Sequence, residues 1–332
     1  MNRFSPCVVQ TILSAVAIST GLFVASAGVA MAADAVMLPK VIKLVVPYAP
    51  GASTDLLARQ LALVLSKRIG NTIIVDNKPG GGSVLGTVIV GNAPPDGATL
   101  LLTSSAFTIN PALQEKPPYD PVNDFAPVAL LTQVPMILAV PASSSYRSPA
   151  DFVNAARAQP GVLNYGSSGI GSTNHLAMEL FKGAAKLQVT HVPYKGMAPA
   201  GVDLSSGQVQ AIIGSYSSLA ALMQGGKVRA LGISSTKPST FFPDLPTLGA
   251  TVPGYSMAGW FGVFAPRGTP PALVQLLNKE IVATINSDEF AKIFAQDRAE
   301  PVEMSATAFS DLVKAETLQW KKIAAEQNIR AQ

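Results

Sequence analysis

Ser172 and His175 are the residues whose types and spacing come nearest to catalytic chemistry. Three positions apart on the first turn of a helix, they could act as a nucleophile and its general base. Nothing near them in the sequence would orient the imidazole, and the chain has only one other histidine, His191. No serine-hydrolase elbow, dinucleotide-binding loop or phosphate-binding loop is complete either. We therefore expect no enzyme, no metal site and no cofactor, and a secreted serine hydrolase using Ser172 and His175 is the alternative.

Anion binding is the other chemistry that the sequence could support. Residues 43–65 and 162–181 each read as a short apolar strand, a glycine-bearing loop and a helix, and both helices begin with the pattern S-T-[DN]-x-L-A. Ser53 or Thr54 would cap the first helix, because a hydroxyl oxygen can accept from a free N–H of the first turn. Helix starts carry free N–H groups and a partial positive charge. The repeat is either ordinary capping met twice or two helix starts pointing into a shared cleft.

Five further residues could have a structural role or contact a ligand. Asp55, in a first helical turn, suits the helix dipole, or it could receive the ammonium group of an amino-acid ligand. Asp203 suggests a structural contact to a loop. Tyr194 and Lys195 follow a strand and form either a solvated turn or a ligand contact. Trp260 is expected in the core or in the wall of a cleft.

The elements that must position these residues alternate between strand and helix over 41–141. This alternation predicts an α/β fold with a mainly parallel sheet and helices on both faces. Loops 48–54 and 104–110, with a helix beginning at Asn110, would lie beyond the strand ends where ligands bind. Residues 128–141 read as a crossing into a second lobe, 239–255 as the lead into the return crossing, and 259–266 as a strand. The end of the chain, 308–332, reads as an amphipathic helix with Lys and Glu on its outer face. We predict lobe 1 over 33–137 and 246–332 and lobe 2 over 138–245, hinged around a ligand cleft.

Composition indicates an exported protein. The long apolar run, 8–29, follows Arg3 and ends in Ala30-Met31-Ala32, which predicts a signal peptide over 1–32 with cleavage near Ala32. Cys7, the only cysteine, lies inside it, so disulfides and cysteine chemistry are excluded from the mature chain. A formal charge of +4 without a basic cluster gives no support for nucleic-acid binding. We expect a soluble periplasmic monomer that could bind an anionic small molecule.

Several motifs, in order along the chain, resemble those of tripartite tricarboxylate transporter receptors, the Bug family of periplasmic solute-binding proteins. The first is YAPGASTD at 48–55 with AR at 58–59, followed by NKPGGG at 77–82 and PDG at 95–97. Later ones are GIGSTNHL at 169–176, VPYKG at 192–196, KVRAL at 227–231 and APRGTP at 265–270. Two departures are Ala52 in place of a glycine, and Gln210 where relatives often carry an aspartate.

The resemblance implies a two-lobed type II periplasmic-binding-protein fold whose lobes are joined by two crossing segments. It implies a receptor that captures a small carboxylate, such as a dicarboxylate, amino acid or aromatic acid, and delivers it to the membrane subunits of a tripartite transporter. A ligand-sensing receptor for a two-component system is a second alternative. Carried over by position, the ligand-binding candidates are Tyr48, Ala49, Pro50, Gly51, Ala52, Ser53, Thr54, Gly169, Gly171, Ser172 and Thr173, with Ser104, Ser105, Tyr194, Lys195 and Ser215 lining the rest.

Overall fold

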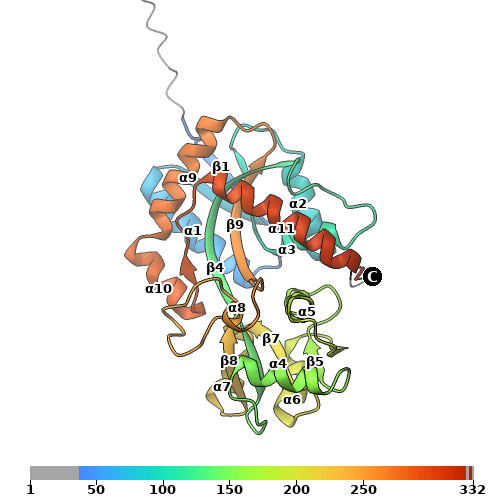
Figure 1. Ribbon diagram of the computed structural model, residues 1–332. Coiled ribbons are helices and arrows are strands. Elements are labelled where there is room, and N and C mark those ends of the chain that lie inside the picture. The colour runs from blue at the N-terminus through green and yellow to red at the C-terminus, as the bar shows by residue number, and fades with distance from the viewer. Residues whose placement is uncertain (1–36, 327–328, 331–332) are drawn as a thin grey trace, which may run out of the picture. The chain divides into compact units, whose positions relative to one another are not determined.

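The first part of the chain forms the parallel strands that the alternation predicts. The computed structural model describes residues 37–326 and 329–330, so the expected signal peptide and its cleavage site lie outside the described residues. Strand β1 (Val41–Val46) pairs in parallel with β2 (Thr72–Asn77) on one side and β3 (Thr99–Ser104) on the other. Helix α1 (Ser53–Ile69) connects β1 to β2, and the 3-10 turn η1 (Gly81–Ser83) with α2 (Val84–Gly91) connects β2 to β3, after which α3 (Ala106–Ala112) follows (Figure 1). Helix α3 thus begins four residues before the expected start at Asn110.

The sheet as a whole is not mainly parallel, so that prediction was wrong. The long strand β4 (Phe125–Pro141) and the returning strand β9 (Ala258–Pro266) run antiparallel to each other, and β9 inserts antiparallel beside β3. Short β10 (Glu300–Pro301) pairs antiparallel with the outer edge of β4. The order is β10-β4-β9-β3-β1-β2. The two segments that cross between the lobes are strands of this sheet, and their opposite directions make it mixed.

Helices cover both faces of this sheet, as predicted. Alternate residues of β1 face opposite sides. Leu44 belongs to a core with α1 and with α9 (Pro271–Ile285) and α10 (Asp288–Asp297), whereas Val45 belongs to a core with α2, α3 and α11 (Ala306–Glu326). The expected C-terminal helix is therefore present, and it packs along this second face.

The far half of β4 organises a second group of elements (Figure 1). There β4 pairs antiparallel with β7 (Ile212–Ser215) and β8 (Val228–Ile233), while β5 (Asn164–Ser167) and β6 (Thr190–Pro193) form a parallel pair. Helices α4 (Pro149–Ala158) and α5 (Thr173–Ala185) share a core with Leu138, and α6 (Met197–Ser206) and α7 (Tyr216–Gln224) share one with Ile137. Short α8 (Leu248–Thr251) precedes the return. The fold is thus α/β and two-lobed, while the predicted lobe boundaries stay a prediction.

Helix α11 joins the two groups of elements. Its Phe309 and Val313 pack into the core of the first group, and Trp320 and Ile323 pack with the α4–α5 core of the second. No helix within 37–326 has both the length and the apolar character needed to cross a membrane.

Candidate functional site

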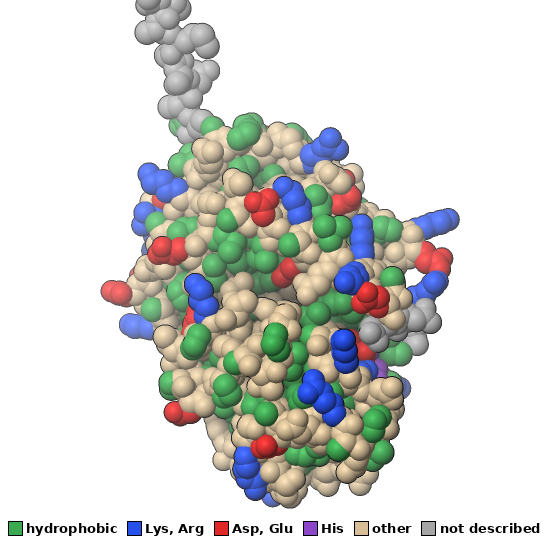
Figure 2. Space-filling view, in the orientation of Figure 1, with side chains coloured by type: hydrophobic (Ala, Val, Ile, Leu, Met, Phe, Trp, Pro, Cys, Tyr) green, Lys and Arg blue, Asp and Glu red, His purple; other side chains and the backbone are tan. Residues whose placement is uncertain are grey.

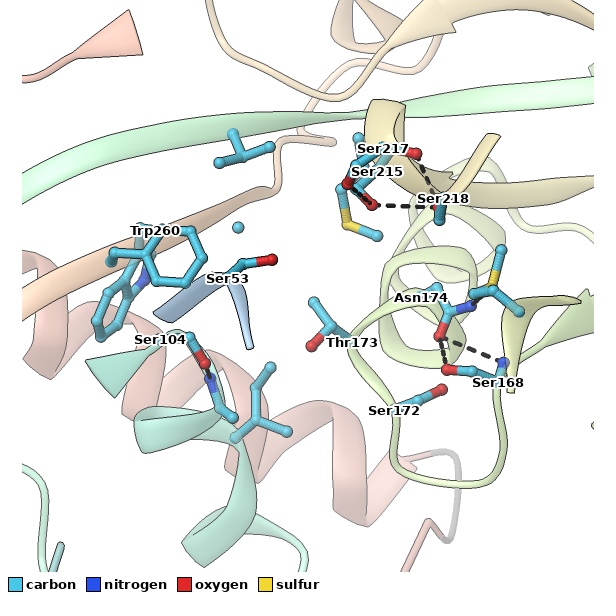
Figure 3. Close-up of a pocket in the computed structure, with 18 of the residues that line it drawn as sticks. Ser53, Ser104, Ser168, Ser172, Thr173, Asn174, Ser215, Ser217, Ser218 and Trp260 are labelled. Carbon is cyan, nitrogen blue, oxygen red and sulfur yellow. Dashed lines mark hydrogen bonds between the residues drawn. The ribbon is translucent and has the colours of Figure 1, made fainter. Parts of the chain in front are cut away.

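A cavity of about 480 Å³ lies where loops from both groups of strands converge (Figure 3). Among the residues that the structure describes, none of those in its wall is Lys, Arg, Asp, Glu or His. Charged side chains lie elsewhere, and on the face in Figure 2 both signs are scattered among each other. The polar lining residues are Tyr48, Ser53, Ser104, Asn110, Ser168, Ser172, Thr173, Asn174, Ser215, Ser217 and Ser218, and the apolar side includes Ile109, Val134, Met136, Met197, Trp260 and Phe261.

The two helix starts singled out by their repeated pattern both reach this cavity. Ser53 is the first residue of α1, and Ser172 is the N-cap of α5, with the His175 N–H donating to its Oγ at 3.4 Å. The expected cap of α1 by Ser53 or Thr54 was wrong, because the N-cap position is Ala52 and no side chain caps it. Thr54 points inward and is buried. Two helix starts thus meet in a shared cleft, and of the two only that of α5 has a side-chain cap.

Asp55 holds the loop that leads into the start of α1. Its carboxylate accepts from the Gly51 N–H at 2.8 Å, from Arg59 Nε at 3.0 Å and from Asn77 Nδ2 at 2.9 Å. Burial raises the pKa of Asp55, but the hydrogen bonds from Arg59, Gly51 and Asn77 outweigh this and hold it below the ordinary value. The side chain is buried and does not line the cavity. Asp55 therefore fixes the 48–54 loop and is not placed to receive a ligand ammonium group.

On the opposite wall, two histidines support the loop before α5. The His175 ring lies 4.0 Å from the His191 ring, centroid to centroid, and nearly parallel to it. Nδ1 of His175 accepts from the Gly171 N–H at 3.0 Å, and Nε2 of His191 lies 2.6 Å from Ser167 Oγ. Burial lowers the pKa of both rings, that of His191 to about 4 with a further contribution from the His175 charge. Both rings are therefore neutral at pH 7.

The same contacts remove the basis for a Ser172–His175 nucleophile pair. Ser172 Oγ donates to the Gly169 carbonyl at 2.6 Å, while His175 Nδ1 is occupied by the Gly171 N–H. A general base must reach the proton that it abstracts. Each group is instead committed to holding the loop, and the serine hydrolase alternative loses its geometric support.

Seven of the sequence-predicted site residues line the cavity, and nine do not. Those that do are Tyr48, Ser53, Ser104, Gly171, Ser172, Thr173 and Ser215. Those that do not are Ala49, Pro50, Gly51, Ala52, Thr54, Ser105, Gly169, Tyr194 and Lys195. Three of the latter have evident reasons, since the Ser105 side chain is buried, Tyr194 donates to Asp203 at 2.6 Å and Lys195 is exposed. This contact also gives Asp203 the structural role that we expected.

Sequence reasoning missed the start of α7 and most of the apolar wall. Ser217 and Ser218 lie beside Ser215 at a third strand–loop–helix junction, which the run 214–218 (GSYSS) could have indicated. Met136 and Met197 come from β4 and α6, and no local pattern distinguishes a cavity-lining methionine from a core one. Trp260 is both buried and in the cavity wall, so its two expected positions coincide.

The two departures from the motifs are accommodated locally. Ala52 has φ −68° and ψ 156°, which any residue adopts, so the loop needs no glycine there. The Gln210 amide accepts from the Asn164 N–H and donates to the Gly207 carbonyl, both at 2.8 Å. Gln210 thus ties the end of α6 to β5 and acts on packing.

Comparison with known proteins assigns the chain to a class. Residues 57–329 match the family model described as "Tripartite tricarboxylate transporter family receptor". The chain belongs to this family of periplasmic solute-binding receptors, to which the Bug proteins also belong, and the family is not one of enzymes.

Three similar proteins illustrate the relationship. Protein BugT of Bordetella pertussis is 34% identical over 310 residues, covering 92% of this chain and 95% of BugT. The solved structure of R. palustris Rpa4515 with adipate is 36% identical, with a TM-score of 0.70 over 88% of this chain and 99% of that one. The structure of MatC (Rpa3494) from Rhodopseudomonas palustris with bound malate is 30% identical, with a TM-score of 0.67 over 86% and 99%.

Proposed function

We propose that this receptor captures a small carboxylate with an apolar body in the cavity between the α1 and α5 helix starts and delivers it to a tripartite membrane transporter. The observation that carries the proposal is a neutral wall of hydroxyl groups and helix starts without a charged side chain. An anion there is held by N–H groups, hydroxyls and helix dipoles, with bridging water where direct contacts fall short.

The apolar side of the cavity narrows the ligand class. Ile109, Val134, Met136, Met197 and Phe261 offer no hydrogen bond, so they favour methylene groups or a ring over further polar groups. Relatives have been solved with an acid of apolar body and with a hydroxylated acid, since Rpa4515 carries adipate and MatC carries malate. Because of this apolar side, we expect the protein to prefer an adipate-like or aromatic acid over a hydroxylated one such as malate.

A thermal-shift screen followed by calorimetry tests this proposal. The ligands would be adipate, benzoate and malate, with benzamide as an uncharged control of benzoate's shape. A ligand present at about 100 times its Kd stabilises the folded state by about 2.7 kcal/mol. We expect adipate or benzoate to raise the melting temperature most and benzamide to have no effect. Tighter binding of malate would contradict the ligand class, and binding of benzamide equal to benzoate would contradict anion recognition.

Export is the remaining part of the proposal. Receptors of this family are periplasmic, and we propose that this chain is processed near Ala32 to begin at about Ala33. Intact-mass analysis of the exported protein should give the mass of 33–332. A mass that still includes Cys7 would show that the apolar segment is retained.

A further inference from the structure

A carboxyl group lies directly behind the wall of the cavity. Glu316, from α11, accepts from the indole Nε1 of Trp260 at 3.0 Å and 2.9 Å through its two oxygens. One of those oxygens, Oε2, also lies 3.0 Å from Thr108 Oγ1 on α3. Trp260 lines the cavity, and so do Ala106 and Ile109 of α3, the helix that carries Thr108. Glu316 therefore joins two parts of the wall from behind.

Counting protons in this network indicates that Glu316 carries one. Thr108 Oγ1 lies within hydrogen-bonding distance of two acceptors, Glu316 Oε2 and the Ser105 carbonyl, both at 3.0 Å, but a hydroxyl has a single proton. If Glu316 is ionised, one of these contacts lacks a proton. If Glu316 is protonated, it donates to Thr108 Oγ1, Thr108 donates to Ser105, and the other oxygen accepts from Trp260. The neutral acid therefore supplies a proton for each of these side-chain contacts, whereas an ionised one leaves Thr108 to donate either to Glu316 or to the Ser105 carbonyl, which also accepts from the Ile109 N–H.

Within the described part of the chain, the surroundings of Glu316 contain no cation that would stabilise a negative charge. The elements that α11 packs against here, α3, β4 and β9, contain no ionisable residue. On α9, Lys279 is exposed and Glu280 pairs with Arg68. The other ionisable side chains of α11 itself face solvent, and they are Asp311, Lys314, Lys321, Lys322 and Glu326.

We propose that Glu316 is a positioning residue which, as a neutral acid, holds Trp260 and Thr108 in place, and that loss of its proton weakens anion binding in the adjacent cavity. This inference rests on the proposed function, because it requires the ligand to be an anion. Burial raises the pKa of Glu316 to about 7, against the opposing effects of the Trp260 indole, the Thr108 hydroxyl and the Trp320 indole. The proton is therefore exchanged within the ordinary range of pH.

The sign of the effect follows from linkage. A bound carboxylate disfavours a second negative charge on the other side of the indole, so binding raises the Glu316 pKa further and takes up a proton. Affinity is then highest below pH 7 and falls as the pH rises. For a coupling of about tenfold, as expected for two partly screened charges, we expect affinity to fall about fivefold between pH 6 and pH 8.

Glu316→Gln is the matched variant, because its amide donates to Thr108 and its carbonyl oxygen accepts from Trp260, as the neutral acid does. The full mature chain would be titrated with adipate and benzoate by calorimetry at pH 6, 7 and 8. Wild type should lose affinity over this range, whereas Glu316→Gln should bind with the wild-type affinity of pH 6 at every pH. Glu316→Leu, which removes both contacts, should bind more weakly throughout while unfolding in urea as a single folded species.

A ligand-free measurement separates this inference from the proposed function. The chain has two tryptophans, and the Trp320 indole also lowers the pKa of Glu316, so Trp320→Phe serves only to assign the two indole N–H signals of an NMR spectrum. The titration is followed in the chain that keeps Trp320, on the signal of Trp260. That signal should titrate near pH 7 and should stop doing so when Glu316→Gln is added. If it titrates but neither carboxylate binds, the Glu316 network stands and the ligand class fails. A signal that does not titrate, or the same pH dependence of affinity in Glu316→Gln as in wild type, would overturn the inference.

Discussion

Acidification should destabilise the protein through the stacked histidines, and the size of the effect can be worked from the structure. His191 has an ordinary pKa of 6.5 in the unfolded chain and about 4 in the fold. Because the folded value is the lower one, the unfolded chain binds the proton first. The stability that the neutral ring contributes is therefore complete above pH 6.5 and is lost as the pH falls toward 4.

At pH 5 the full pKa difference corresponds to about 2 kcal/mol of lost stability. The ring is only partly buried, so solvent screening reduces this to about 1 kcal/mol. Protonation also has a local cost, because a charged His175 no longer accepts the Gly171 N–H that fixes the loop at the cavity. We therefore expect weaker ligand binding as well as lower stability below pH 5.

The measurement is unusually direct because the chain contains only two histidines. Their ring protons give two titrating NMR signals, and urea unfolding at pH 7 and pH 5 gives the free-energy change. His191→Phe keeps a stacked ring that cannot take up a proton, so its stability should change less between the two pH values. If both histidines titrate near 6.5, or if His191→Phe shows the full wild-type pH dependence, the stack does not hold its rings neutral and the reasoning fails.

Three further predictions concern the ligand site. Ser172→Ala should weaken carboxylate binding about tenfold or more, because the loop at the start of α5 loses the hydrogen bonds of Ser172 Oγ to the Gly169 carbonyl and from the His175 N–H, each contributing about 1 kcal/mol, while exposed Lys195→Ala should change little; calorimetry with the reverse order would place the anion elsewhere. Asp55→Ala should lower the unfolding free energy by about 2 kcal/mol, because Gly51 and Asn77 lose their buried acceptor; wild-type urea unfolding would refute this. Saturating ligand should reduce the radius of gyration measured by X-ray scattering, and coincident curves would argue against closure of the lobes.

Local chemistry made the cavity partly predictable from the sequence. Ser172 could be identified as a cap because its partner, the His175 N–H, is three residues away. The same reasoning failed at Ser53 and Thr54, because the N-cap position of α1 is Ala52 and the loop before it is held by Asp55, whose partner Asn77 comes from strand β2. Short-range patterns reveal caps and strands, but they do not reveal which polar residue will form a hydrogen bond with a distant element.

Pairings over long sequence separations account for the larger misses. The insertion of β9 between β3 and β4 depends on pairings between residues about 160 and 130 positions apart. Nothing in the sequence of 258–266 indicates which strands it pairs with or in which direction. The inward position of Glu316 was missed for the same reason. In a helix expected to place Lys and Glu on its outer face, Glu316 turns toward Trp260 instead. The indole donor that draws it inward is 56 residues away.

Strand β4 is shared by both lobes without a break. Its first half pairs with β9, and its second half is the strand to which both β7 and β8 are hydrogen-bonded. In each lobe, part of the hydrogen-bonded strand pairing is therefore made by a strand that continues into the other lobe. If the strands of one lobe separate, they expose a strand whose hydrogen bonds continue into the other lobe. Amide hydrogen exchange should therefore report the global unfolding free energy over the whole length of β4. Such a receptor can bend where its two lobes meet and still unfold as one cooperative unit.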